Sequence, residues 1–208
     1  MFSQYYCDSE LPFGVKRLRF DEVCDIKGGK RLPTDHELID EPTNHPYIRV
    51  RDVGASKYLC LTDQFQYIDE DTFSSISRYI VQENDILLSI VGTIGLLGIV
   101  HSSLDNANLT ENCVKLTNFR DGVSSDYIYH TLCYKKARRE IDLLTVGAVQ
   151  AKLPLYNIQS LPIIKPSEEE LTCFQNEMDA LDSQLRTNII EMNKLQSLLQ
   201  MVLIGLSD

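Results

Sequence analysis

Hydrophobic and polar positions divide this chain of 208 residues into two parts with different periodicity. In the first 165 residues, short β-branched and aromatic runs alternate with turn residues, a pattern typical of strands joined by loops. The strand candidates are VKRLRF (15–20), YIRVRDV (47–53), DILLSIV (85–91), GLLGIV (95–100) and ENCVKLT (111–117). Because glycines interrupt the apolar run between 85 and 100, we expect a buried hairpin or tight corner there.

Residues 125–141, SDYIYHTLCYKKARREI, predict a helix. A serine or aspartate at its start suits an N-cap, and the Lys/Arg cluster near its end suits the negative end of the helix dipole. The cluster is therefore open to two interpretations, dipole complementation or a DNA-binding patch.

The last forty residues carry apolar side chains at steps of three and four, which predicts a helix with a heptad seam. Pro166 and Ser167 with three following glutamates favour a helix start, and Gly205 favours a stop. A helix over 167–204 would be about 57 Å long at about 1.5 Å per residue. The seam consists of Leu171, Phe174, Met178, Leu181, Leu185, Asn188, Met192, Leu195, Leu199 and Val202.

So long a helix exceeds what a domain of this size needs for its own core, so we expect it to pair with a second long helix from another chain. Asn188 interrupts the seam, where a buried amide tends to fix the register or oligomeric state. The alternative is that the helix folds back along its own domain. The predicted fold class is therefore α+β: a mixed, β-rich domain over 1–165, followed by one long C-terminal coiled-coil helix over 166–208.

Composition fits a folded protein, with 43% hydrophobic residues. No run of 18 apolar residues and no signal-peptide pattern occurs, so we expect a cytoplasmic protein with no membrane partner. The six cysteines form no CxxC pair and the four histidines form no i, i+4 pair, which argues against disulfides and a metal site. We expect no cofactor.

The net charge of −10 argues against a nucleic-acid partner only if it is evenly distributed. Residues 166–208 hold eight acidic and two basic side chains and so carry −6, which leaves −4 on the other 165 residues. Basic residues cluster within 16–31, 49–57 and 135–139. These clusters are consistent with a positive face, or with ordinary solvated charges.

Catalytic motifs are not found. PTNHPY (42–47) resembles the Asn-Pro-Pro-Tyr motif of amino-methyltransferases, but His45 replaces the first proline and no glycine-rich cofactor loop follows a strand. Around glycines 92, 95 and 98 one strand follows another, whereas a nucleotide loop lies between a strand and a helix. GGKR (28–31) suits a phosphate-binding turn through backbone amides and two cations. A stand-alone nuclease or methyltransferase is thus disfavoured.

The order of several short segments resembles one half of a type I restriction-modification specificity subunit. The segments are LPFGVKRLRFDEVCDIKGGKRLP (11–33), HPYIRVRDV (45–53), NDILLSIVGTIGLLGIV (84–100), LTENCVKL (109–116), Gly147 to Gln150, LPLYNIQSLPI (153–163) and KPSEEEL (165–171). Two departures are Val15, where the family commonly has tryptophan, and Glu170, near where it has glutamine. The full family subunit carries two recognition domains and two antiparallel helices, so this chain resembles a dimerising half-subunit or a fragment.

The resemblance implies a non-catalytic subunit that binds double-stranded DNA, docks a DNA adenine methyltransferase subunit and, through it, a motor-nuclease restriction subunit. It also implies a homodimer through the C-terminal helix. The expected DNA contacts are Lys27, Lys30, Arg31, Arg49, Arg51, Lys57, Thr93, Gln150 and Lys152. The alternative function is a coiled-coil protein-protein interaction module with no DNA role.

Overall fold

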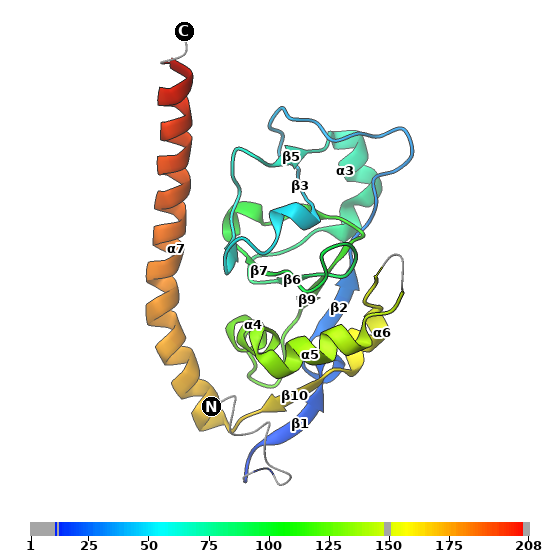
Figure 1. Ribbon diagram of the computed structural model, residues 1–208, viewed down its shortest axis with the longest axis vertical. Helices are drawn as coiled ribbons and strands as arrows, with labels where there is room; N and C mark the ends of the chain where they lie inside the picture. Colours follow the sequence, from blue (N-terminus) through cyan, green and yellow to red (C-terminus); the bar gives the residue numbers. More distant parts are fainter. Residues whose placement is uncertain (1–10, 12, 148–150, 206–208) are drawn as a thin grey trace.

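The protein is described by a computed structural model covering residue 11, residues 13–147 and residues 151–205. Short strands and short helices are interspersed in the first part, and one long helix follows them (Figure 1). The strands are β1 (Lys16–Arg19), β2 (Asp25–Gly28), β3 (Pro46–Ile48), β4 (Tyr58–Leu59), β5 (Gln66–Tyr67), β6 (Ile86–Ser89), β7 (Leu97–Val100), β8 (Asn108–Leu109), β9 (Cys113–Thr117) and β10 (Pro162–Lys165). The α-helices are α2 (Phe20–Val23), α3 (Glu70–Ile76), α4 (Ser125–Cys133), α5 (Lys135–Leu144), α6 (Leu155–Ser160) and α7 (Glu168–Gly205), and the 3-10 helices are η1 (Val50–Asp52), η2 (Ser77–Tyr79) and η3 (Ser102–Leu104).

The strands form three small sheets, of which the largest has the order β2-β9-β6-β7-β4. A three-stranded sheet has the order β5-β3-β8, and β1 pairs with β10 alone. The β4–β7 and β3–β8 pairs are parallel and the other pairs are antiparallel. This mixed pairing followed by a long helix confirms the predicted α+β class.

The β6–β7 hairpin forms the centre of the main sheet, as the sequence predicts. Ile86 pairs with Ile99 and Leu88 with Leu97. Gly92 and Gly95 take φ values of +78° and +86° in the connecting turn, a region that favours glycine. Ile86 and Leu88 contribute to one apolar cluster and Leu87 to another, so both faces of the strand are buried. Burial on both faces explains the continuous apolar run.

Two predicted elements are wrong in part. The strand expected over 47–53 ends at Ile48, because Asp52 accepts hydrogen bonds from both the backbone N and the side chain of Arg49 and turns the chain into η1. The helix expected over 125–141 divides at Tyr134, whose extended backbone ends α4 and precedes α5. The Lys/Arg cluster therefore begins a helix instead of ending one, so the dipole interpretation is wrong.

Helix α7 begins at Glu168 and ends at Gly205, close to the predicted 167–204. Ser167 and Glu170 cap it reciprocally: Ser167 N donates to Glu170 Oε2 at 3.0 Å, and Glu170 N donates to Ser167 Oγ at 3.4 Å. The helix runs along one side of the domain, and its C-terminal end extends beyond the domain (Figure 1).

The first turns of α7 belong to the core of the domain. Leu171 and Phe174 are buried in the same cluster as Tyr127 and Ile163, and Phe174 meets the Tyr127 ring edge-on at 5.6 Å. The structure thus shows contact between α7 and its own domain. The N-terminal part folds back on its own domain, which was the alternative interpretation.

Five cysteines lie in the described residues and none of them is disulfide-bonded. Three are buried and two, Cys133 and Cys173, are exposed. Cys7 lies outside the described residues.

Candidate functional site

Three of the expected DNA contacts project from the edge strand β2 and the segment that follows it. The Lys27 side chain is exposed, and its Nζ lies 3.5 Å from Asp25, a carboxylate that also accepts a hydrogen bond from Arg120. The Arg31 side chain is 80% exposed although its Nε lies 2.8 Å from Glu111. Lys30 lies with its Nζ 5.9 Å from the centre of the Tyr79 ring. These contacts leave Lys27 and Arg31 facing solvent.

Backbone amides of the GGKR turn already donate hydrogen bonds within the protein. Gly29 N donates to Cys113 O at 3.1 Å, and Lys30 N donates to Leu109 O at 2.8 Å. A Cβ on Gly29 would lie 2.1 Å from Thr110 O, so only glycine permits this close approach. The expectation that these two amides cradle a phosphate is therefore wrong, and the side chains alone remain for that role.

Two expected contacts are held inside the protein. The Arg49 side chain is 14% exposed, pairs with Asp52 at 2.9 Å and also donates to Gln66. The Lys57 side chain is 9% exposed and lies between Asp126 and Asp182. Both cations are satisfied by buried carboxylates, so neither is available to a phosphate. Arg51, by contrast, is 67% exposed.

Thr93 and Lys152 are brought together from distant parts of the chain. Thr93 lies in the β6–β7 turn, and Ser89 Oγ donates to its carbonyl at 2.6 Å. Lys152 forms backbone bridges with Val91, beside that turn, and with Val146. Both side chains are exposed, and Arg138 reaches the same turn by donating to Gly95 O. Gln150 lies outside the described residues.

These two groups share one side of the domain. In Figure 1 the end of β2 and helix α6, which follows Lys152 closely in the chain, both lie on the side away from α7. The segment that begins with β2 and carries Lys27, Lys30 and Arg31 thus starts on the side of the domain away from α7, whereas Lys57 contacts α7.

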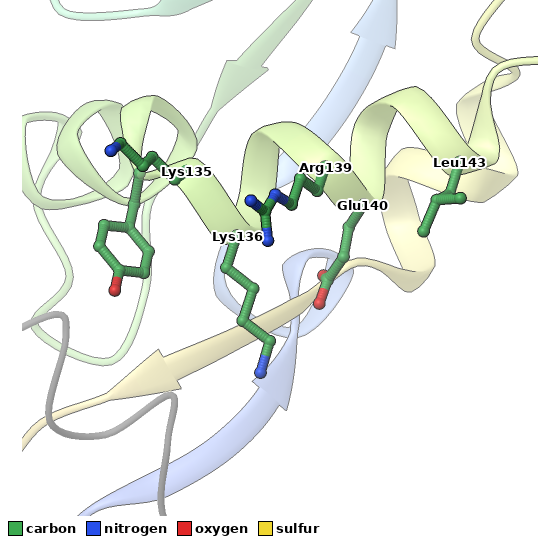
Figure 2. Close-up of a pocket in the computed structure, with 6 residues that line it drawn as sticks. Lys135, Lys136, Arg139, Glu140 and Leu143 are labelled. Atoms are coloured by element: carbon green, nitrogen blue, oxygen red, sulfur yellow. The ribbon is translucent and has the colours of Figure 1, made fainter.

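A second cationic surface covers α5. Lys135, Lys136, Arg139 and the exposed Leu143 line a shallow depression with Tyr134 and Glu140. Figure 2 shows the Lys136 and Glu140 side chains extending from α5 in the direction of β1 and β10. Burial raises the pKa of Glu140, and the charges of Lys136 and Arg17 act against that rise.

The predicted seam of α7 is exposed beyond its first turns. Leu181 is 62% exposed and Leu195 is 65% exposed. Leu171 and Phe174 are buried and Met178 packs against the same cluster, so these three are unavailable to a partner helix. The exposed members, called the distal seam below, are Leu181, Leu185, Asn188, Met192, Leu195, Leu199 and Val202.

Sequence reasoning did not find the residues that join α7 to the domain. Asp182 and Arg186 bind Lys57 and Glu83 respectively. Because these pairs are separated by about a hundred residues or more, no local pattern marks them. Asp182 on an otherwise exposed helix resembles any solvated acidic residue.

The described residues hold no group of three His, Cys, Asp or Glu side chains placed to bind a metal ion. Among those same residues, no helix is long and apolar enough to cross a membrane.

Comparison with known proteins gives one family and several similar structures. The family model described as "Type I restriction modification DNA specificity domain" matches residues 12–200. A search of curated proteins finds no match.

Three solved structures share the fold. A chain from a study of complex assembly and conformational transition of the type I R-M system is 19% identical, with a TM-score of 0.61 over 88% of this chain and 42% of that chain. The HsdS subunit from Thermoanaerobacter tengcongensis is 19% identical, with a TM-score of 0.62 over 87% and 40%. The type I S subunit from M. genitalium is 16% identical, with a TM-score of 0.56 over 87% and 42%. The chain thus spans less than half the length of each of these proteins.

Proposed function

This chain belongs to the family of type I restriction-modification DNA specificity domains, and we propose that it reads one half-site of a two-part DNA sequence. The observation that carries the proposal is the family match, which extends over 12–200 and so includes both the domain and most of α7. In this proposal the chain supplies recognition and no catalysis. A DNA adenine methyltransferase subunit docks on it, and a restriction subunit joins through that complex.

The exposed cations among the expected contacts suit the DNA backbone. Lys27, Lys30, Arg31 and Arg51 neutralise phosphates and set the position of the domain, while polar side chains in the major groove select bases. Thr93 and Lys152 form a second contact near the β6–β7 turn. The net charge of −10 does not oppose this arrangement, because −6 of it lies in residues 166–208.

The distal seam suits pairing with a second α7. An apolar stripe in water is stabilised by burial against another, and Asn188 within it suits a register-fixing amide. Two identical chains related by a twofold axis would read two identical half-sites in opposite orientation, with a gap fixed by the helices. We therefore propose a homodimer through the distal seam.

Salt-dependent binding to duplex DNA tests the DNA role. A phosphate contact contributes about −0.9 to the slope of log K against log salt concentration. The variant Lys27→Gln/Lys30→Gln/Arg31→Gln is expected to reduce the size of that slope by about 2 to 3. The matched control, Lys135→Gln/Lys136→Gln/Arg139→Gln, removes the same charge from α5 and is expected to keep the parental slope.

Fluorescence anisotropy with labelled duplexes at several salt concentrations gives both slopes. An equal loss in the two variants would mean that the segment after β2 has no special part in binding. Absence of salt-dependent DNA binding by the parent chain would favour the protein-protein interaction module instead.

A further inference from the structure

The contact between α7 and the domain changes in character along the helix. Leu171 and Phe174 bind through apolar burial in the first turns. Further along, Ile189 packs against the core cluster, but the directional contacts are polar. They join Asp182 to Lys57, Arg186 to Asn84, and Ser197 to Asp63. The helix is thus held to the domain by polar groups beside an exposed apolar stripe.

Lys57 is the centre of these polar contacts. Its Nζ lies 2.6 Å from both carboxylate oxygens of Asp182 and 2.8 Å from Asp126 Oδ1. All three side chains are 12% exposed or less. Tyr58 O–H donates to Asp126 at 3.3 Å. One cation from the loop before β4 therefore joins α4 to the middle of α7.

The next turn of α7 is held by the neighbouring residue of the domain. The Arg186 guanidinium lies 4.1 Å from the centre of the Tyr58 ring. The same side chain donates to Asn84 Oδ1 at 3.1 Å and lies 3.6 Å from Glu83. Asp182 and Arg186 are one turn apart, so Lys57 and Tyr58 contact two successive turns on one face of α7.

This face differs from the face that carries the distal seam. At 3.6 residues per turn, the centre of the distal seam lies about 110° around the helix from Asp182 and about 150° from Arg186. A rotation of α7 by about 110° would turn the seam toward its own domain, where apolar burial would stabilise it. Ion pairs depend on direction and distance, whereas apolar contacts do not, so the polar contacts oppose such a rotation.

We propose that Lys57, Asp126, Asp182 and Arg186 form an orientation lock, which fixes the rotation of α7 on the domain and keeps the distal seam turned outward for a partner helix. Apolar residues would hold the helix as firmly, because a buried ion pair seldom adds stability over an apolar replacement. The ion pair instead restricts α7 to a single rotational orientation on the domain. Under the proposed function, on which this role rests, the lock also sets the angle between each recognition domain and the helix pair.

A variant that replaces the lock with apolar and neutral groups tests the proposal. Lys57→Met/Asp126→Asn/Asp182→Leu leaves no buried charge unpaired. The matched control is Lys115→Met/Asp85→Asn, which removes a buried Lys–Asp pair of 3.1 Å between β9 and the residue before β6 and keeps Glu83 and Asn84, the partners of Arg186. Lys57→Arg serves as the conservative variant.

The position of α7 is measured as the distance between spin labels at Ser74→Cys in α3 and Lys194→Cys in α7. Exposed native cysteines are replaced by serine, and labelled chain is diluted with unlabelled chain so that distances within one chain dominate. We expect a narrow distance distribution in the parent, the control and Lys57→Arg. In the lock variant the distribution should shift or become at least about twice as wide, with unchanged helix content by circular dichroism. An unchanged distribution in the lock variant, or equal broadening in the control, would overturn the proposal.

If the lock variant does not fold, Arg186→Leu serves in its place. It removes the contacts that Arg186 makes with the domain and leaves no unpaired buried charge. It should broaden the distribution by a smaller amount, and a parental distribution would count against the lock. These distances are measured without DNA. A failure of DNA binding therefore leaves them unaffected, and the two proposals can fail separately.

Discussion

Lys57 Nζ lies 2.6 Å from both carboxylate oxygens of Asp182, a residue 125 positions further along the chain. This pair connects the start of the main sheet's edge strand to the middle of the long helix. Burial acts to raise the pKa of the adjacent Asp126, but the hydrogen bond and charge of Lys57 outweigh it, so the pKa is lowered. A cation that would suit DNA by its charge and position in the sequence is thus a structural residue.

The two ends of the α7 seam should respond differently to truncation. Phe174→Ala opens a cavity in the core and should cost about 3 to 5 kcal/mol of unfolding free energy. Leu199→Ala removes an exposed side chain and should change that free energy by less than about 0.5 kcal/mol. Urea titration at low protein concentration, where chains are unpaired, measures both. Equal changes in unfolding free energy would mean that the two ends of the seam do not differ in their role.

A charge in the distal seam should prevent self-association. Leu195→Asp would bury an unpaired carboxylate in a helix pair, which is costly. We expect the sedimentation mass to fall from that of a dimer to that of one chain. Thr187→Asp adds the same charge on a different, exposed face of α7 and should leave the mass unchanged. If Leu195→Asp remains a dimer, the chain associates with itself through a surface other than the distal seam.

Helix length should set the gap between half-sites. Inserting a second copy of residues 188–201 after residue 201 adds two heptads, which preserves the seam and its register and lengthens the helix by about 21 Å. At about 3.4 Å per base pair, the gap in the recognised sequence should lengthen by about 6 bp. Mapping methylated sites in cells that carry the lengthened chain gives the gap. Retention of the parental gap would contradict a ruler role for α7.

His130 should make the protein less stable in mild acid. Burial, followed by the positive charge of Lys57, lowers the pKa of His130 from its ordinary value of 6.5, and burial also lowers that of His101. The folded state therefore resists a proton that the unfolded state accepts as pH falls below about 6.5, so stability is full above that pH and declines below it.

The variant His130→Phe keeps an aromatic ring against Phe174 and cannot titrate. Between pH 7 and pH 5 its unfolding free energy should fall less steeply than that of the parent, and His101 contributes to the slope that remains. Unfolding in urea at each pH measures both slopes. Identical slopes would show that His130 takes up its proton equally in the folded and unfolded states.

The sequence predicted the elements whose cause is local. The β6–β7 hairpin follows from apolar runs separated by glycines, and α7 follows from its periodicity and its Ser167/Glu170 cap. The division at Tyr134 was not predictable, because the apolar pattern of residues 125–141 continues through it. The burial of Lys57 was equally unpredictable, since the carboxylates that bind it come from α4 and α7, whereas Asp52, which binds Arg49, lies only three residues further along the chain. Charge in a sequence marks a candidate contact, but burial decides whether it remains one.

Selection of bound duplexes from a random DNA library tests the central claim most directly. The chain would be purified natively with whatever proteins accompany it, and bound duplexes would be recovered and sequenced. Reading of half-sites by two paired chains predicts enrichment of one motif with two specified parts separated by a fixed gap. Recovery of DNA with no enriched motif, or of no DNA above background, would contradict sequence recognition by this chain.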